Sequence, residues 1–322
     1  MSGTAPSVPS IHEVEDALRD GLALGDENLA AARPVLSHLL TSGDQALFSD
    51  ELLARIRGMA NHCARQLLEA LAKDTDPAAH YQSLFGDYQL PLAQSLLDNQ
   101  ELLIHTHAAA LEAQLAFRLQ QRSGIDPVLS PLIQEMMASQ DSALSTAAMH
   151  VLAAQARFIQ QQRRMEMPLA ELPGDLFHLA LLSLRECGAG EPVTCAQTES
   201  RLRAGFDEGR QRIGQITRFI MTLDHKANRA LSLDHAGLGI FATALSMATA
   251  QSREVAVFAM GENQLARLAL TLRAAGLSPA ALEEQFLYLH PEIALPPGFE
   301  NMTATRAADL LAASPLAREP LV

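Results

Sequence analysis

The chain has 322 residues, of which 48% are hydrophobic, and a formal net charge of −13 at pH 7. The length predicts about two domains or one extended helical array, and the hydrophobic content suffices for a sizeable core. The acidic balance argues against nucleic acid as the main partner, because binding to phosphate backbones depends on excess positive charge.

Strong helix formers fill almost every segment between the breaks in this sequence: Ala, Leu, Gln, Glu and Arg. No five or six residues alternate between apolar and polar as a half-buried strand requires. We therefore predict an all-α fold, either an irregular multi-helix bundle or stacked helical hairpins, with a solenoid-like C-terminal half.

In the N-terminal half, Gly, Pro and polar capping residues mark where the predicted helices begin, bend or end. The first stops at Gly25, the second is kinked at Pro34, and Ser49 caps a third, whose buried stripe includes Met59 and Cys63. Asp126-Pro127 opens another, because Asp is a good N-cap and Pro fits the first helical turn. The predicted spans are 11–24, 27–40, 50–71, 88–99, 100–121, 142–165 and 173–186.

The C-terminal half is predicted to begin with one long helix, which is followed by short, closely spaced ones. Gly276 is expected to end a helix, and Ser278 with Pro279 to begin the next. Short links make neighbouring helices fold back on each other, hence the solenoid-like prediction. The predicted spans are 198–223, 234–249, 252–260, 262–275, 278–289 and 303–313.

The most loop-like interior stretch runs from Cys187 to Cys195 and contains two Gly and one Pro. We take it as the boundary between two halves. The predicted organisation is a disordered tail at 1–10, an N-terminal helical domain at 11–188, a loop or linker at 189–197, a C-terminal helical domain at 198–315 and a tail at 316–322.

Four short segments of the C-terminal half carry a resemblance: Phe241-Ala-Thr-Ala-Leu, Ser252-Arg-Glu-Val-Ala-Val, Leu265-Ala-Arg-Leu-Ala-Leu and Arg273-Ala-Ala-Gly-Leu277. Together they resemble a helical domain of alphaproteobacterial proteins that forms a family of unknown function. The resemblance covers the C-terminal third to half of the chain. It implies an all-helical bacterial cytosolic protein and supplies no catalytic residue.

The sequence contains no phosphate-binding loop, dinucleotide-binding glycine motif, nucleophile elbow or His-Glu-x-x-His zinc motif. We therefore predict no cofactor and no bound metal, and favour a protein that is not an enzyme. The most apolar long stretch, residues 236–250, would form a helix of roughly 22 Å, too short for the ~30 Å hydrocarbon core of a bilayer. We expect no membrane span.

Seven basic residues stand against three acidic ones in the stretch 201–229. This segment is either a solvated helix face or a docking surface for an acidic partner. As a docking surface, its candidate binding residues are Arg203, Arg210 and Arg218. The basic residues are Arg201, Arg203, Arg210, Arg212, Arg218, Lys226 and Arg229.

Two groups of histidines and carboxylates are candidates for chemistry. Glu101, His105 and Glu112 share one helix face and could contribute to a metal site if another helix added ligands, but a solvated polar stripe is the simpler interpretation. His107, on the apolar side of that helix, is expected to be a buried, hydrogen-bonded histidine.

The second group is the repeated step Asp224-His225 and Asp234-His235, an alternative site for a general base or a metal. The simpler interpretation of Asp234 is an N-cap.

The three cysteines predict a reducing cytosol. Cys63 is expected to be buried. Cys187 and Cys195 could pair as a disulfide or share a metal, but the simplest interpretation is two free thiols, both reactive in the native protein.

These features favour a cytosolic protein–protein interaction or regulatory module. The alternative is an enzyme, or a protein that binds a small molecule or a metal, with a site between the two halves. The sequence does not fix the oligomeric state.

Overall fold

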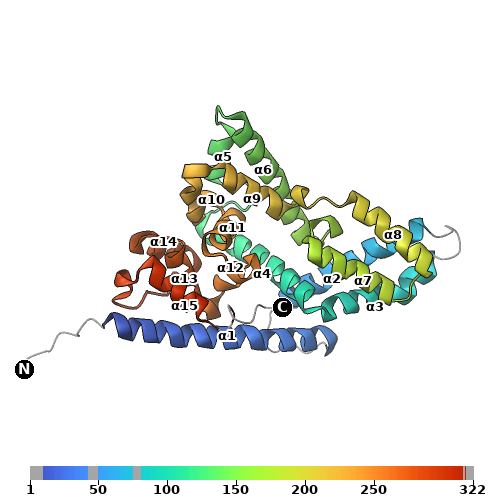
Figure 1. Ribbon diagram of the computed structural model, residues 1–322, viewed down its shortest axis with the longest axis horizontal. Helices are drawn as coiled ribbons and strands as arrows, with labels where there is room; N and C mark the ends of the chain where they lie inside the picture. The colour runs from blue at the N-terminus through green and yellow to red at the C-terminus, as the bar shows by residue number, and fades with distance from the viewer. Residues whose placement is uncertain (1–9, 43–49, 75–80, 315, 317–322) are drawn as a thin grey trace, which may run out of the picture. The chain divides into compact units, whose positions relative to one another are not determined.

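The computed structural model describes residues 10–42, 50–74, 81–314 and 316, and within them every regular element is a helix (Figure 1). The predicted all-α fold is therefore confirmed. The solenoid-like arrangement of the C-terminal half stays a prediction. No helix among the described residues is both long and apolar enough to cross a membrane.

The helices follow one another with short connections. The α-helices of the first half are α1 (Ile11–Ser42), α2 (Asp50–Lys73), α3 (Tyr81–Asp98), α4 (Gln100–Ser123), α5 (Pro131–Met137), α6 (Ser142–Arg163) and α7 (Gly174–Glu186). Those that follow are α8 (Pro192–Gly205), α9 (Arg212–Thr222), α10 (Leu233–Ala236), α11 (Leu238–Thr249), α12 (Arg253–Ala259), α13 (Leu265–Ala274), α14 (Pro279–Leu289) and α15 (Ala304–Ala312). Short 3₁₀ helices are η1 (Leu169–Glu171), η2 (Glu208–Arg210), η3 (Asp224–Leu231), η4 (Glu262–Gln264) and η5 (Phe299–Asn301).

The chain divides into two compact units, each assembled from separate stretches. Unit 1 comprises Met1–Ala31, Leu115–Glu135 and Leu223–Val322, and unit 2 comprises Ala32–Gln114 and Met136–Thr222. The predicted linker at 189–197 lies within unit 2, where α8 already begins at Pro192. The predicted domain boundaries stay a prediction, and the tails at 1–10 and 316–322 fall almost entirely outside the described residues.

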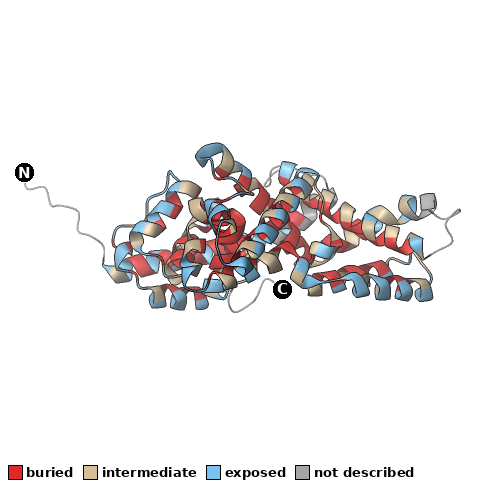
Figure 2. Ribbon diagram, turned by 90° about the horizontal axis from the view of Figure 1, so that it is seen from above, coloured by how far each residue is buried: buried red, intermediate tan, exposed pale blue. Residues whose placement is uncertain are grey.

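The core of unit 2 is built around the predicted apolar stripe of α2. Met59 and Leu67 are completely buried and Cys63 is 3% exposed, which confirms the stripe. This stripe packs on α3, α7 and α8. Figure 2 shows buried residues in red alternating with exposed residues in pale blue along the helices. Each fully buried Leu or Met contributes about 1.5–3 kcal/mol relative to an exposed one, so this interface contributes substantially to the stability of the unit.

In unit 1, α1 packs closely on the region of η4 and α13. A Cβ atom built on Gly21 would lie 3.1 Å from the Cβ of Ala266, and one on Gly25 would lie 2.8 Å from Gln264 Oε1. The prediction that a helix ends at Gly25 is therefore wrong. This glycine lies inside α1, where the lack of a side chain allows the close approach.

One further contact in unit 1 is a buried ion pair. Arg267 of α13 pairs with Asp26 of α1, and both side chains are less than 5% exposed. Because an isolated buried charge is very costly, each member of the pair requires the other.

The prediction of one long helix over 198–223 is also wrong. α8 ends at Gly205, and Phe206 leaves the helix in an extended conformation to stack on Phe177, with ring centroids 4.2 Å apart. The Asp207 side chain then accepts a hydrogen bond from the backbone N–H of Gly209, which starts η2. Burial of the Phe206 ring thus replaces continuation of the helix.

Several predicted helix ends are confirmed. The side chains of Ser252 and Ser278 cap α12 and α14, and Gly276 follows α13 with φ of 91°. Asp234, however, is not an N-cap. Ser232 occupies the cap position of α10, and Gly237, with φ of 76°, separates α10 from α11.

Candidate functional site

The three arginines predicted to form a docking surface come from three different elements of unit 2. Arg203 lies on α8, Arg210 on η2 and Arg218 on α9, and all three are exposed. Their exposure agrees with a surface role, but their surroundings differ.

Arg203 is already engaged within the protein. Its Nε and Nη2 atoms lie 3.1 and 2.9 Å from Glu199 Oε1, and Arg185 pairs with the same carboxylate. Hydrogen bonding from Arg203 and Arg185 lowers the pKa of Glu199 from its usual value. Because the charge of Arg203 is largely compensated, it is the weakest of the three candidates.

Arg210 and Arg218 are held next to each other by contacts between η2 and α9. Gln215 Nε2 donates to the backbone oxygen of Arg210 at 2.7 Å, and Arg218 Nη2 donates to the backbone oxygen of Gly209 at 3.2 Å. Gly214 allows this approach, since a Cβ atom there would lie only 2.8 Å from the Glu208 carbonyl oxygen. The backbone of Arg210 and the side chain of Arg218 are thus anchored at the same η2–α9 junction.

No carboxylate among the described residues forms an ion pair with Arg210 or Arg218. The nearest acids in sequence, Asp207 and Glu208, accept hydrogen bonds from the backbone N–H groups of Gly209 and Gly174. A guanidinium carries five donors, so Arg218 retains most of its capacity after binding one carbonyl. We call Arg210 and Arg218 the arginine surface.

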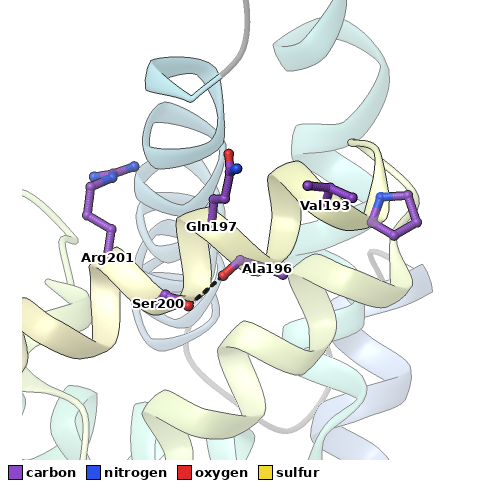
Figure 3. A pocket seen from close by; sticks show the side chains of 6 residues that line it. Val193, Ala196, Gln197, Ser200 and Arg201 are labelled. Atoms are coloured by element: carbon purple, nitrogen blue, oxygen red, sulfur yellow. Dashed lines mark hydrogen bonds between the residues drawn. The ribbon is translucent and has the colours of Figure 1, made fainter.

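A shallow pocket lies on one face of α8 (Figure 3). Its polar side chains are engaged locally: Ser200 Oγ donates to the Ala196 carbonyl, and Arg201 Nη2 lies 2.7 Å from both Asp74 Oδ2 and the Ala70 carbonyl oxygen. Nothing among its described lining residues resembles a nucleophile with a base. The lining residues are Pro192, Val193, Ala196, Gln197, Ser200 and Arg201.

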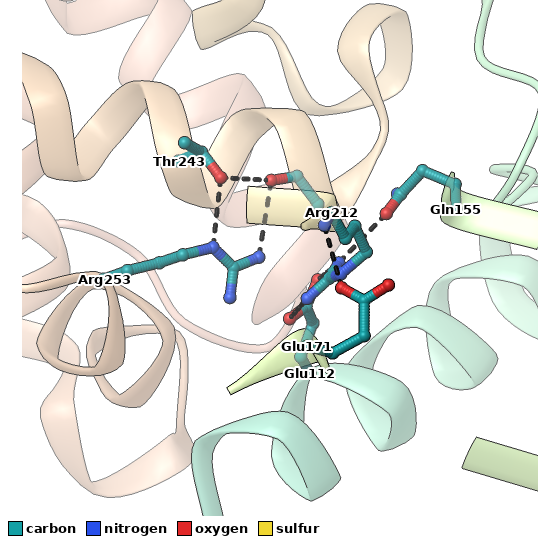
Figure 4. Close-up of polar contacts among 7 residues, drawn as sticks. Glu112, Gln155, Glu171, Arg212, Thr243 and Arg253 are labelled. Atoms are coloured by element: carbon teal, nitrogen blue, oxygen red, sulfur yellow. Dashed lines mark hydrogen bonds and ion pairs between the residues drawn. The ribbon is translucent and has the colours of Figure 1, made fainter. Parts of the chain in front are cut away.

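The buried polar centre of unit 2 surrounds Arg212, at the start of α9 (Figure 4). Its Nη1 and Nη2 atoms lie 2.7 and 2.8 Å from the two carboxylate oxygens of Glu112, and Nη1 also lies 2.9 Å from Gln155 Oε1. The guanidinium stacks 3.6 Å from the ring centroid of Phe158. The backbone N–H of Arg212 donates to Glu171 Oε2 at 2.8 Å.

Arg212 was grouped with the basic face of 201–229 by its charge alone, and that assignment is wrong. Its side chain is 6% exposed and that of Glu112 is 2% exposed. A signal was present, because Arg212 occupies the same helical stripe as the buried Ile216 and Phe219. The pair joins α4, α6 and α9 and is closed to substrates, so we assign it a structural role.

The Glu101, His105 and Glu112 stripe does not form the metal site considered from the sequence. Glu112 is used by Arg212, and no cluster of three potential ligands occurs among the described residues. His107 is half-buried, and desolvation lowers the pKa of its imidazole to about 4. His105, considered for a solvated stripe, is buried instead, at 7% exposed.

The two Asp-His steps of unit 1 have separate surroundings. Asp224 and His225 are both at least 80% exposed, with His225 Nδ1 3.5 Å from Asp224 Oδ2. Asp234 accepts from the Ser232 hydroxyl, whereas His235 Nε2 accepts from Arg229 at 3.0 Å. No hydrogen bond or ion pair among described residues joins the two steps.

All three cysteines are free. Burial raises the pKa of the Cys63 thiol to about 12, as expected for an inert core cysteine. Cys195 is only 4% exposed, so the prediction that it sits in an accessible loop is wrong; it lies in the first turns of α8 and faces Gly190. Cys187 is half-buried, and burial raises its pKa as well.

Comparison of the chain with protein-family models, with curated proteins and with solved structures finds no match. The resemblance of the C-terminal half to an alphaproteobacterial family of unknown function therefore stays a prediction.

Proposed function

We propose that this protein is a cytosolic, non-enzymatic protein–protein interaction module that binds an acidic partner through the arginine surface. The supporting observation is that Arg210 and Arg218 are exposed, held together, and without a carboxylate partner among the described residues. In an otherwise acidic molecule, such a surface attracts negative charge locally and steers association. Three free cysteines favour a reducing compartment.

The candidate residues for chemistry give less support to the alternative, an enzyme. Glu112 is bound by a buried arginine, and His235 accepts from Arg229 beside Glu135. Asp224 and His225 are both at least 80% exposed, whereas catalytic acids and bases usually lie in clefts.

The proposal is tested by capture from the cytosol of the source organism with the full chain as bait. The test variant is Arg210→Glu/Arg218→Glu. The matched control is Arg163→Glu/Arg164→Glu, which makes the same change in net charge at two exposed residues at the end of α6. We expect at least one stoichiometric protein to be captured by the wild type and the control but not by the test variant. An identical set of captured proteins for all three baits would contradict the proposal.

A further inference from the structure

The arginine surface continues into an exposed apolar side chain. Met221 lies on α9, three residues after Arg218, and is 69% exposed. Side chains three residues apart on a helix are neighbours, about 5–6 Å apart at Cβ. The opposite side of α9 is occupied by Ile216, Phe219 and Ile220, which are buried. Met221 is therefore not part of the packing of this helix within unit 2.

A surface that combines Arg210, Arg218 and Met221 has the residue types that are common at the centre of protein interfaces. Arg and Met are both enriched in protein interfaces, whereas Lys and the acids are depleted. Methionine also adapts its shape to a partner because it is unbranched and flexible. From Gly214, where η2 is held, to Met221 the helix advances about 10 Å, or two turns.

We propose that Arg210, Arg218 and Met221 dock an acidic amphipathic helix, with the two arginines pairing its carboxylates and Met221 packing on its apolar stripe. This inference rests on the proposed function and names the chemistry of the partner. A helix presents residues from successive turns on one face, so two turns of partner carry both an apolar residue and the carboxylates that flank it. A fully extended acidic segment would satisfy the arginines but gain less from Met221.

The probes are two synthetic peptides of about 20 residues, long enough to form helix. Both are Glu-rich and have equal charge; one carries Leu on a single helical face and the other has Ala at those positions. Binding of the full-length protein is measured by fluorescence anisotropy at low salt. We expect the Leu peptide to bind at least tenfold more tightly than the Ala peptide.

Two variants separate the contributions. Met221→Gln should weaken the Leu peptide about tenfold and leave the Ala peptide unchanged, whereas Arg210→Glu/Arg218→Glu should weaken both. The matched control is Met149→Gln on α6, since Met149 is another exposed methionine of unit 2, at 47%. It should change neither affinity.

These measurements distinguish failure of the amphipathic-helix inference from failure of the proposed function. Equal affinity for both peptides, or an unchanged Leu-peptide affinity in Met221→Gln, would overturn the amphipathic-helix inference while leaving an acidic partner possible. Unchanged binding in the Arg210→Glu/Arg218→Glu variant would overturn the proposed function itself.

Discussion

Replacing Arg212 by Ala should strongly destabilise unit 2, because it leaves the Glu112 carboxylate buried without its guanidinium partner. Both side chains are less than 10% exposed, and two hydrogen bonds of 2.7 and 2.8 Å join them. Breaking a buried pair by removing one member typically costs 3–5 kcal/mol. Loss of the guanidinium also removes its stacking on Phe158 and the bond to Gln155. A loss of about 3–5 kcal/mol lowers the ratio of folded to unfolded molecules by two to three and a half orders of magnitude.

The assay is urea unfolding followed by circular dichroism, with the midpoint of the unit 2 transition as readout. For a slope of about 2–3 kcal/mol/M, the midpoint should fall by roughly 1–2.5 M. The control is Arg65→Ala, which breaks an exposed pair with Glu69 on α2 and should cost less than about 1 kcal/mol. Arg212→Lys should fall between these values, since Lys keeps the charge but not the planar, two-pronged contact. Equal, small shifts for Arg212→Ala and Arg65→Ala would refute the assignment of Arg212 to the core.

Three further outcomes are expected. Gly58→Ala should lower the free energy of unfolding by about 1–3 kcal/mol, because the added Cβ would lie 2.5 and 2.9 Å from atoms of Met165, in the turn after α6. Gly86→Ala, in the same unit but with open space around the added Cβ, should raise the free energy of unfolding by about 0.5–1 kcal/mol. Urea unfolding midpoints check both predictions. The pKa of His107 is about 4 in the folded protein and 6.5 in the unfolded chain, so between pH 6.5 and pH 4 only the unfolded chain takes up a proton at this residue. Stability should thus fall by up to about 3 kcal/mol as the pH drops from 6.5 to 4, and His107→Leu should flatten this dependence. Iodoacetamide should label half-buried Cys187 before the two buried cysteines, as peptide mass spectrometry can show; faster labelling of Cys195 would contradict its placement.

Features that depend on neighbouring residues in the sequence were predictable. The all-α fold follows from helix formers and caps, and Ser252, Ser278 and Gly276 act where the sequence places them. Gly25 was misinterpreted because its neighbour, Gln264, lies 239 positions away, so a glycine needed for close packing looks like a helix stop.

The candidate site was predictable only in part. The exposed arginines of the 201–229 stretch were found from charge, but their separation onto three elements depends on the stacking of Phe206 on Phe177, which no local pattern reveals. The burial of Arg212 depends on Glu112, 100 positions earlier, although its place on an apolar stripe was a usable signal.

The most direct test of the central claim is the association rate of the captured partner at low and high salt. It compares the wild type, Arg210→Glu/Arg218→Glu and the charge-matched control Arg163→Glu/Arg164→Glu. Because electrostatic steering acts over about 8–10 Å at physiological salt, reversing the arginine surface should slow association at least about tenfold at low salt. The rates of all three proteins should converge at high salt, with the control close to the wild type throughout. Equal slowing by both charge reversals would attribute steering to net charge, and an unchanged rate in Arg210→Glu/Arg218→Glu would place the interface elsewhere; either result contradicts the account.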